Sequence, residues 1–496
     1  MLSFFRLDLR SLAALRVALG FILFYDLLTF LPMAEFYLSD QGFVTRLDFL
    51  KEQANPWNWS ILYITGSSYF LYAFLGWHFV TLLLFIVGYK TRWQTFFIWI
   101  QIVSLHNRNW VVLNGGDELV RCCFILLIFL PLGAIYSWDQ YHKKNDSPPT
   151  MLVTNSFFNL AIFLQLSIMY VSSAIFKNHP IWNRDYSALH YALNLDLFVR
   201  PAGLWLRNQD LLIQPLTAFA YYFELFAPLL IILGIIRPLW NFSRYLLVIS
   251  FITFHLFIDT ILSVGTFPYF AIAIWLAFLP SHFWENCKID HQVYRFFRKI
   301  HQFLKQGKIL SLHFFHKTIF LRRILFNTLA VFFIVNLLYW PLKDKNFRFD
   351  VGQKYYPSFF QQTNRWLATY QDWHLFAPFP KIDNLWMEVT GTLNDGTKVD
   401  LYRLKSKDNK LSAKEVQTYY SVEKWRKIFL KLENSKIHQD WLSDYYCKEW
   451  QKLSKGQFDN QSLKLVTINA YHQITQGRGF ASEARKEQLV SSYVCP

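Results

Sequence analysis

Lys177 stands where a long apolar run gives way to the polar sequence Asn-His-Pro. Pro180 disfavours helix at His179, so a helix over the apolar run is predicted to end close to Lys177. Tyr170 and Ser173 would share one face of that helix with Lys177. A buried lysine can lose its proton and act as a base, whereas a lysine at the end of a membrane helix commonly extends toward the lipid headgroups. The spacing leaves both interpretations open.

A second group of polar residues lies in the segment LNGGDELVR, residues 113–121. Gly115 and Gly116 permit a tight turn, and Asp117 suits the first turn of a following helix. Arg121 stands four residues later, inside an apolar run, where a charge usually faces a protein interior or a wet cavity. The alternative is an ion pair between Asp117 and Arg121 on the same helix.

The third group is the segment FHLFIDTILSVGTFPY, residues 254–269. His255 and Asp259 are four residues apart, so on a helix they can share a face. A buried histidine–aspartate pair can orient a proton carrier. The alternative is a polar pair whose hydrogen bonds are satisfied at a helix end, next to the turn that Gly265 and Pro268 permit.

The composition predicts that these segments belong to a polytopic membrane protein. The chain has 496 residues, of which 53% are hydrophobic and 19% aromatic. Apolar runs of the length needed to cross a bilayer recur, and the first is too long, and lacks the cleavage site, for a signal peptide. We expect about nine transmembrane helices, in an all-α domain over residues 1–343. The predicted spans are 11–33, 69–88, 92–105, 118–136, 153–177, 211–235, 240–258, 262–280 and 323–342.

Residues 344–496 are more polar and are predicted to form a small α+β domain outside the membrane. Asn394-Asp395-Gly396 within 385–403 indicates a β-hairpin, and 412–455 reads as helical. Cys447 and Cys495 can form a disulfide if this domain lies in an oxidising compartment. No spacing of cysteine and histidine in the chain favours a metal site.

The net charge of +16 arises largely from loops between the apolar runs. The excess of lysine and arginine predicts a cytoplasmic N-terminus and a periplasmic or extracellular C-terminal domain, in an inner-membrane protein. The basic, phenylalanine-rich segment 292–320 is predicted to be an interfacial helix on anionic lipid rather than a nucleic-acid site. On this topology all three polar groups fall at the outer side, where a cavity entered from the lipid would suit a quinone or a lipid. No inverted repeat of broken helices favours a transporter, and no GxSxG, Walker, HExxH or Rossmann motif indicates another enzyme class.

Several segments together resemble the HTTM family, the bacterial relatives of the vitamin K-dependent gamma-carboxylase. They are LRVALGFILFYDLLTFLP, SLHNRN, LNGGDELVR, FLPLGA, FHLFIDTILSVGTFPY and YQDWHLFAPFP. The resemblance covers residues 8–400, and YVSSAIFKNHPIW places Lys177 at the position of the family's lysine.

The resemblance implies a membrane carboxylase-like lyase or quinol epoxidase with Lys177 as the base. That lysine would deprotonate a vitamin K-type hydroquinone such as menaquinol. Reaction with oxygen would give a stronger base that removes a γ-proton from a glutamate of a secreted peptide or protein, and the carbanion would take up carbon dioxide. His255 matches a histidine of the family. The residues expected to shape or close the cofactor pocket are Asp117, Arg121, Tyr170, Ser173, Asp259, Trp373 and His374.

The chain departs from the animal enzyme in two respects. It has Gly115-Gly116 where that enzyme has an Asn-His pair, and it lacks much of the lumenal part that recruits substrates. The alternative function is therefore a non-catalytic lipid- or quinone-binding membrane protein, or a partner in peptide export or immunity.

Overall fold

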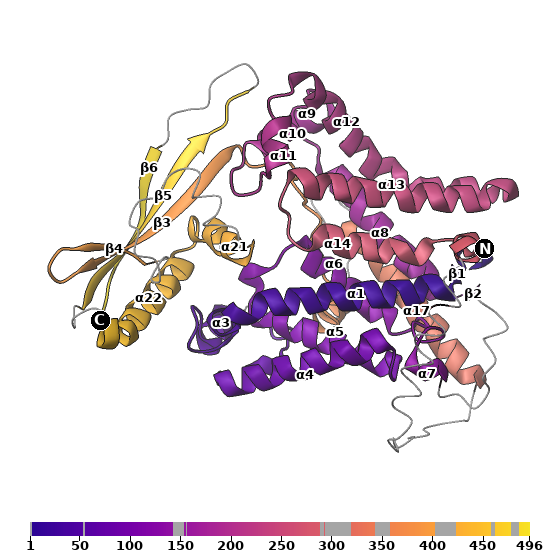
Figure 1. Cartoon of the computed structure of the whole chain (residues 1–496), viewed down its shortest axis with the longest axis horizontal. Helices are drawn as coiled ribbons and strands as arrows, with labels where there is room; N and C mark the ends of the chain where they lie inside the picture. The colour runs from indigo at the N-terminus through magenta and orange to yellow at the C-terminus, as the bar shows by residue number, and fades with distance from the viewer. Residues whose placement is uncertain are drawn as a thin grey trace.

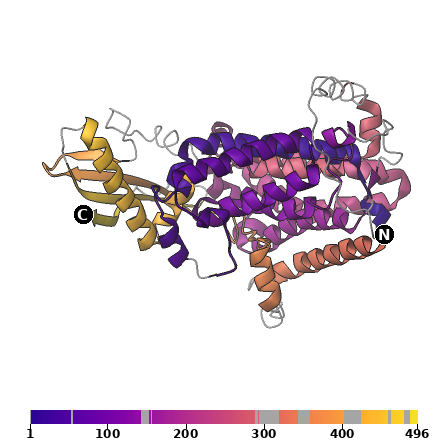
Figure 2. The ribbon, with the colours of Figure 1, turned by 90° about the horizontal axis from the view of Figure 1, so that it is seen from below.

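The computed structural model describes residues 2–52, 55–141, 153–154, 156–287, 292, 319–342, 358–401, 423–457, 462–477 and 486–496. A bundle of helices makes up most of the molecule, and a small sheet lies beyond one of its ends (Figure 1). The N-terminus lies at the other end of the bundle, and the view from below shows the same arrangement (Figure 2).

Each predicted span overlaps with a helix of the bundle. The helices are α1 (Leu9–Phe30), α4 (Ser68–Val87), α5 (Thr91–Arg108), α6 (Gly115–Leu127), α8 (Phe157–Phe176), α12 (Asp210–Phe226), α13 (Trp240–Ile261), α14 (Phe267–Trp275) and α17 (Ile319–Leu342). The 3-10 segment η5 (Ala227–Ile235) continues α12, and β1 (Leu7–Asp8) pairs with β2 (Val153–Thr154) beside the start of α1.

Five helical segments among the described residues are long and apolar enough to cross a membrane: 9–38, 68–87, 157–176, 210–235 and 237–261. The prediction of a mostly helical, membrane-associated chain is therefore confirmed, but the count of nine spans is not. Two further apolar helices, Phe267–Phe278 and Ile324–Tyr339, are shorter. The helix predicted over 118–136 ends at Leu127 and continues as turns.

Aromatic rings pack between the helices α8, α13 and α14. The side chain of Trp275 on α14 is fully buried, and its ring lies 4.3 Å from that of Phe251 on α13 and 6.3 Å from that of Tyr170 on α8. Large buried rings contribute most to the apolar area that a core removes from water. This packing fixes the relative position of α8, α13 and α14, which carry Tyr170 and His255. The long helix α17 packs against α8 along one side of the bundle (Figure 2).

Short helices cap the end of the bundle that faces the sheet. They are α2 (Ala34–Leu38), α3 (Arg46–Glu52), α9 (Pro180–Asn183), α10 (Ala188–Leu193) and α11 (Pro201–Leu206). The ring of Phe36 on α2 stacks on that of Trp425 at 4.5 Å, so these short helices contact the C-terminal part directly.

The C-terminal part contains α19 (Ser358–Trp366), β3 (Asp383–Leu393), β4 (Lys398–Asp400), α21 (Glu423–Leu432), α22 (Lys436–Gln457), β5 (Leu463–Ile474) and β6 (Lys486–Val494). The strands form an antiparallel sheet in the order β4-β3-β5-β6, against which α22 packs. The hairpin is confirmed, with Gly396 in the turn at a φ of +88° that favours glycine. The disulfide between Cys447 and Cys495 is present.

The helical prediction for 412–455 holds from residue 423 onward, and residues 402–422 lie outside the described part of the chain. The interfacial helix predicted over 292–320 falls almost entirely outside it too.

Residues 364–376 run back into the bundle although they follow the predicted domain boundary. The side chains of Gln371 and Gln165 are joined by a 2.7 Å hydrogen bond, and those of Asn364 and Asn336 by another of 2.7 Å. Buried amides of this kind need such partners, because an unpaired buried amide costs about 1–3 kcal/mol. The bundle is thus completed by polypeptide from beyond residue 343.

Candidate functional site

A cavity of about 300 Å³ lies at the end of α8 nearest the sheet. Apolar side chains of α10, α12 and α13 form most of its wall, and the segment 374–376 covers one side. Its polar lining residues are Asn114, Tyr170, Ser173, Lys177, Thr217, Glu224, His255, His374 and Lys427. The three segments that the sequence placed at the outer side therefore each contribute to one cavity.

Lys177 is the residue at which α8 stops, and its side chain turns into the protein. Only 2% of its surface is exposed. Its Nζ donates a 2.9 Å hydrogen bond to Oγ of Ser173, forms an ion pair with Glu224, and lies 4.8 Å from the ring centre of Trp182. A lysine that snorkels would present its ammonium to headgroups or water. The geometry of Lys177 is that of a buried, partnered amine.

Glu224 on α12 was not predicted from the sequence. It is an acidic residue in the apolar run LTAFAYYFELFAPLL, and its carboxylate accepts a hydrogen bond from Lys177. A carboxylate in such a run is a functional candidate by default, which was the signal available. Lys177 follows the last residue of α8. Burial lowers the pKa of its ammonium group, whereas the nearby Glu224 carboxylate raises that pKa.

Tyr170 and His255 form a second polar pair in the cavity wall. The hydroxyl of Tyr170 and Nε2 of His255 are hydrogen-bonded at 2.5 Å, and the indole N–H of Trp275 donates to the same hydroxyl at 3.2 Å. His255 is fully buried. Its Nδ1 has no hydrogen-bond partner in the described part of the chain. A buried polar atom without a partner beside a cavity is a natural contact for a ligand.

The predicted pair of His255 and Asp259 is wrong. The carboxylate of Asp259 pairs with Arg200 at 2.9 Å and accepts a hydrogen bond from Tyr269 at 2.6 Å. Arg200 belongs to the loop before α11. Its guanidinium is charged and therefore binds the Asp259 carboxylate more strongly than the neutral imidazole of His255, one helical turn away, would. Asp259 anchors that loop and is not among the residues that line the cavity.

Asp117 and Arg121 do not form the ion pair considered as the alternative for this segment, although Asp117 does stabilise the start of the helix. Asp117 closes a capping box with Asn114 and lies 3.5 Å from Nε2 of His106. Arg121 donates to the carbonyl of Tyr370 at 2.8 Å and to its hydroxyl at 3.0 Å. Both side chains are buried, but neither lines the cavity.

Gly115 and Gly116 start α6 rather than form a tight turn. Neither has a positive φ. A Cβ at Gly116 would meet the backbone of Phe267 at 2.8 Å, so the glycine allows α6 and α14 to approach closely.

Trp373 and His374 were expected to close the site, but only His374 lines the cavity. The ring of His374 stacks on that of Phe176 at 4.2 Å. Trp373 points away and donates a 2.6 Å hydrogen bond to Gln371. Trp373 therefore positions the backbone that carries His374.

The cavity reaches the outer surface of the helices between α12 and α13. Phe219 and Phe257 both line it, yet they are 55% and 39% exposed. Both helices belong to candidate membrane spans, so this side of the cavity would face lipid.

One group outside the cavity has the composition of a metal site. Asp383, Glu433 and His472 offer ligand atoms within 4.8 Å of one another. His472 is hydrogen-bonded to Asp383 at 2.6 Å, and Lys381 lies 3.6 Å from Glu433. These contacts account for the cluster without a cation.

Comparison with models of known protein families, with curated proteins and with solved structures gave no match to this chain. The chemistry of the cavity residues must therefore support any function proposed for it.

Proposed function

We propose that the chain is a carboxylase-like membrane enzyme of the HTTM type, which binds a hydroquinone in the cavity and uses Lys177 as a base. The observation that carries the proposal is the burial of Lys177 beside Glu224 in the wall of an apolar cavity. Lysines that serve as bases need removal from bulk water and a nearby group that tunes their proton affinity.

The cavity suits a flat, mostly apolar ligand with polar groups at its edge. Its volume of about 300 Å³ lies at the lower end of the range for ligand sites, roughly 300–1,000 Å³. The rings of Phe219 and Phe257 would let an apolar tail pass toward the lipid while the ring of the ligand stays inside. A menaquinol-type compound has this division into polar ring and apolar tail.

The pairing of Lys177 with Glu224 is compatible with a base. Moving the proton from the ammonium to the carboxylate turns an ion pair into an amine and a carboxylic acid without changing net charge. Low-dielectric surroundings favour the neutral pair, because each buried ion carries a large desolvation cost. The pair can therefore present a neutral amine to a ligand hydroxyl.

His255 would bind the ligand oxygen. The hydroxyl of Tyr170 accepts from Trp275 and can donate its own proton to Nε2 of His255. The proton of the neutral imidazole then sits on Nδ1, which lacks a partner in the described part of the chain. An N–H in this position stabilises negative charge on an oxygen from which Lys177 has taken the proton.

The resemblance implies that the deprotonated hydroquinone would react with oxygen to give a strong base. That base would remove a γ-proton from a glutamate, and the resulting carbanion would take up carbon dioxide. The glutamate would belong to a secreted peptide or protein. We propose the C-terminal domain outside the cytoplasm, with a cytoplasmic N-terminus, and the Cys447–Cys495 disulfide supports this orientation because such bonds persist in oxidising compartments.

The decisive experiment measures epoxide formation by the purified chain in nanodiscs with reduced vitamin K or menaquinol, oxygen and carbonate. Wild type should produce epoxide and Lys177→Ala should not. Lys51→Ala is the matched control, because Lys51 is an exposed lysine at the end of α3. Epoxide formation at the wild-type rate in Lys177→Ala would refute the role of Lys177.

The second candidate is a non-catalytic protein that binds a lipid or quinone in the same cavity. A purely structural ion pair between Lys177 and Glu224 would satisfy both buried charges in a binding cavity without any proton transfer. Gly115-Gly116, in place of the Asn-His pair, points the same way. Quinone binding without turnover under all these conditions would select this function.

A further inference from the structure

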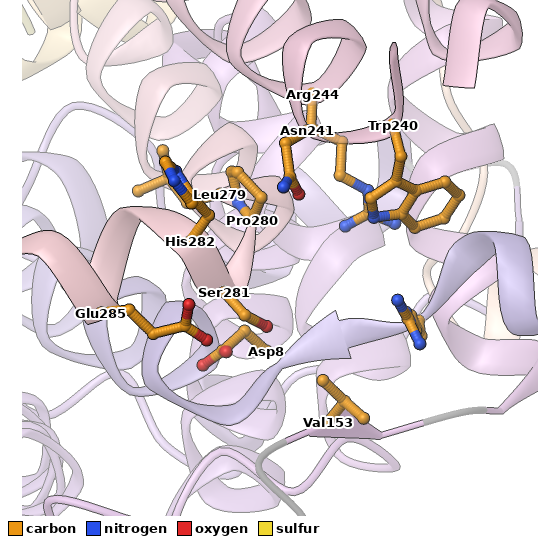
Figure 3. Close-up of a pocket in the computed structure, with 11 residues that line it drawn as sticks. Asp8, Val153, Trp240, Asn241, Arg244, Leu279, Pro280, Ser281, His282 and Glu285 are labelled. Atoms are coloured by element: carbon orange, nitrogen blue, oxygen red, sulfur yellow. The ribbon is translucent and has the colours of Figure 1, made fainter. Parts of the chain in front are cut away.

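A second cavity, of about 240 Å³, lies at the end of the bundle opposite the sheet (Figure 3). It is formed by the N-terminal segment, the first turns of α13, and the residues from Leu279 into the helix α15 (Ser281–Cys287). Figure 3 shows Arg244 and Trp240 on one side of it and Asp8 and Ser281 on the other. None of these residues belongs to the site beside Lys177.

Arg244 is a buried cation that faces this cavity. It is only 2% exposed, and its guanidinium lies 4.5 Å from the ring centre of Trp240. One N–H donates to the carbonyl of Phe4 at 3.1 Å, whereas Nε has no hydrogen-bond partner. Among the described residues no carboxylate lies within ion-pair distance of Arg244. A buried guanidinium without an anion is costly, so the site is incomplete by itself.

The other charges around the cavity do not supply the missing anion. Arg6 also lines the cavity, and its guanidinium lies 5.4 Å from the ring centre of Trp240. The carboxylate of Asp8 is held by Arg10, which pairs with it at 2.9 Å and also donates its backbone N–H at 2.8 Å. Glu285 is exposed at the rim. Positive charge therefore predominates where Arg6 and Arg244 approach Trp240.

We propose that this cavity binds a phosphate-bearing anion, held by Arg244 and Arg6 and bordered by Asn241. Guanidinium groups match phosphate oxygens with paired hydrogen bonds, and the free Nε of Arg244 is a donor for one of them. The asparagine amide can donate another hydrogen bond, and Trp240 keeps the two guanidinium groups oriented. The anion is either the headgroup of an anionic lipid or a small phosphate compound from the aqueous phase.

Native mass spectrometry of the delipidated full chain in a non-ionic detergent tests this binding. Phosphatidylglycerol should bind at least about tenfold more tightly than phosphatidylcholine with the same acyl chains, or ~1.4 kcal/mol. Thermal unfolding with inorganic phosphate tests the other source. If inorganic phosphate stabilises the protein and competes with the lipid, the natural ligand is a small phosphate compound. If the lipid binds and phosphate has no effect, the ligand is a lipid headgroup.

Arg244→Gln and Arg6→Ala should each weaken the binding by about tenfold, the effect of losing one hydrogen bond to a charged group. Arg6 is exposed, so its substitution tests the site without disturbing the core. Arg237→Ala is the matched control, because Arg237 is an exposed arginine on η6 (Arg237–Leu239) that does not line the cavity. Binding that is equal in all variants, or absent for both lipid and phosphate, would overturn the proposal.

Discussion

Each end of the bundle holds a buried cation beside a cavity, but only one of the two cations has a carboxylate partner among the described residues. Near the sheet, Lys177 has an internal carboxylate, Glu224, in an apolar cavity. At the opposite end, Arg244 has a carbonyl and an aromatic ring but no carboxylate among the described residues. The first site is already balanced in charge, and the second is not.

This difference separates two kinds of binding. A balanced pair can accept an uncharged amphipathic ligand and exchange a proton with it, because neither step leaves a net charge buried. An arginine holds its proton under nearly all conditions, so a site built on it recruits an anion rather than transferring protons. The type of cation and its partner thus distinguish the two cavities more clearly than their size does.

Breaking the balanced pair should have the largest effect. Lys177→Met leaves the Glu224 carboxylate buried without its cation, which should cost about 3–5 kcal/mol of stability and abolish epoxide formation. Thermal unfolding in nanodiscs and the epoxide assay measure the two effects. Adding Glu224→Leu should restore most of the stability but no turnover. A double variant as unstable as the single one would show that the pair is not what Lys177→Met disrupts.

Removing the disulfide should affect only the end near the sheet. Cys447→Ser with Cys495→Ser opens a loop of 48 residues and should lower the stability of the C-terminal part by about 2–4 kcal/mol. Quinol binding should weaken because Lys427 on α21 lines that cavity, while anion binding at Arg244 should stay unchanged. Titrations of both ligands check this, and equal weakening of the two would contradict the independence of the ends.

Removing the unbalanced cation should cost little in the absence of an anion. Arg244→Gln loses a hydrogen bond to the carbonyl of Phe4 but relieves a buried charge, so stability in lipid-free detergent should change by no more than about 1 kcal/mol. Stabilisation by phosphatidylglycerol should disappear in the same variant. A loss as large as that of Lys177→Met would mean that Arg244 has an internal structural role instead.

The smallest effect is expected at Asp259. Asp259→Asn weakens its ion pair with Arg200, whose side chain is 37% exposed, so stability should fall by only about 0.2–1 kcal/mol. Turnover should match wild type, since Asp259 is not among the residues that line the cavity. A clear loss of epoxide formation, measured beside Lys51→Ala, would show that Asp259 does contribute to the site.

Local spacing predicted some parts of this molecule well. The proline after His179 predicted the end of α8, and Asn394-Asp395-Gly396 predicted the hairpin, because each depends on a few adjacent residues. The shared face of Ser173 and Lys177 followed from helical periodicity, and the two side chains are hydrogen-bonded.

Contacts between distant segments could not be predicted in this way. Glu224 lies 47 residues from Lys177, and Tyr370 lies 249 residues from Arg121. For Arg121 the acidic residue one helical turn earlier, Asp117, is taken by a helix cap and a histidine. Spacing identifies which residues can share a face, but the packing of the helices decides which partner each one meets.

The return of residues 364–376 into the bundle has a consequence for the order of biosynthesis. Arg121 and Gln165 are made early, yet their partners Tyr370 and Gln371 follow them 249 and 206 residues later in the chain. The early helices must therefore wait in the bilayer with unmatched polar groups until the C-terminal polypeptide arrives. A chain that stops after residue 343 should consequently be retained by quality control rather than accumulate as a folded bundle.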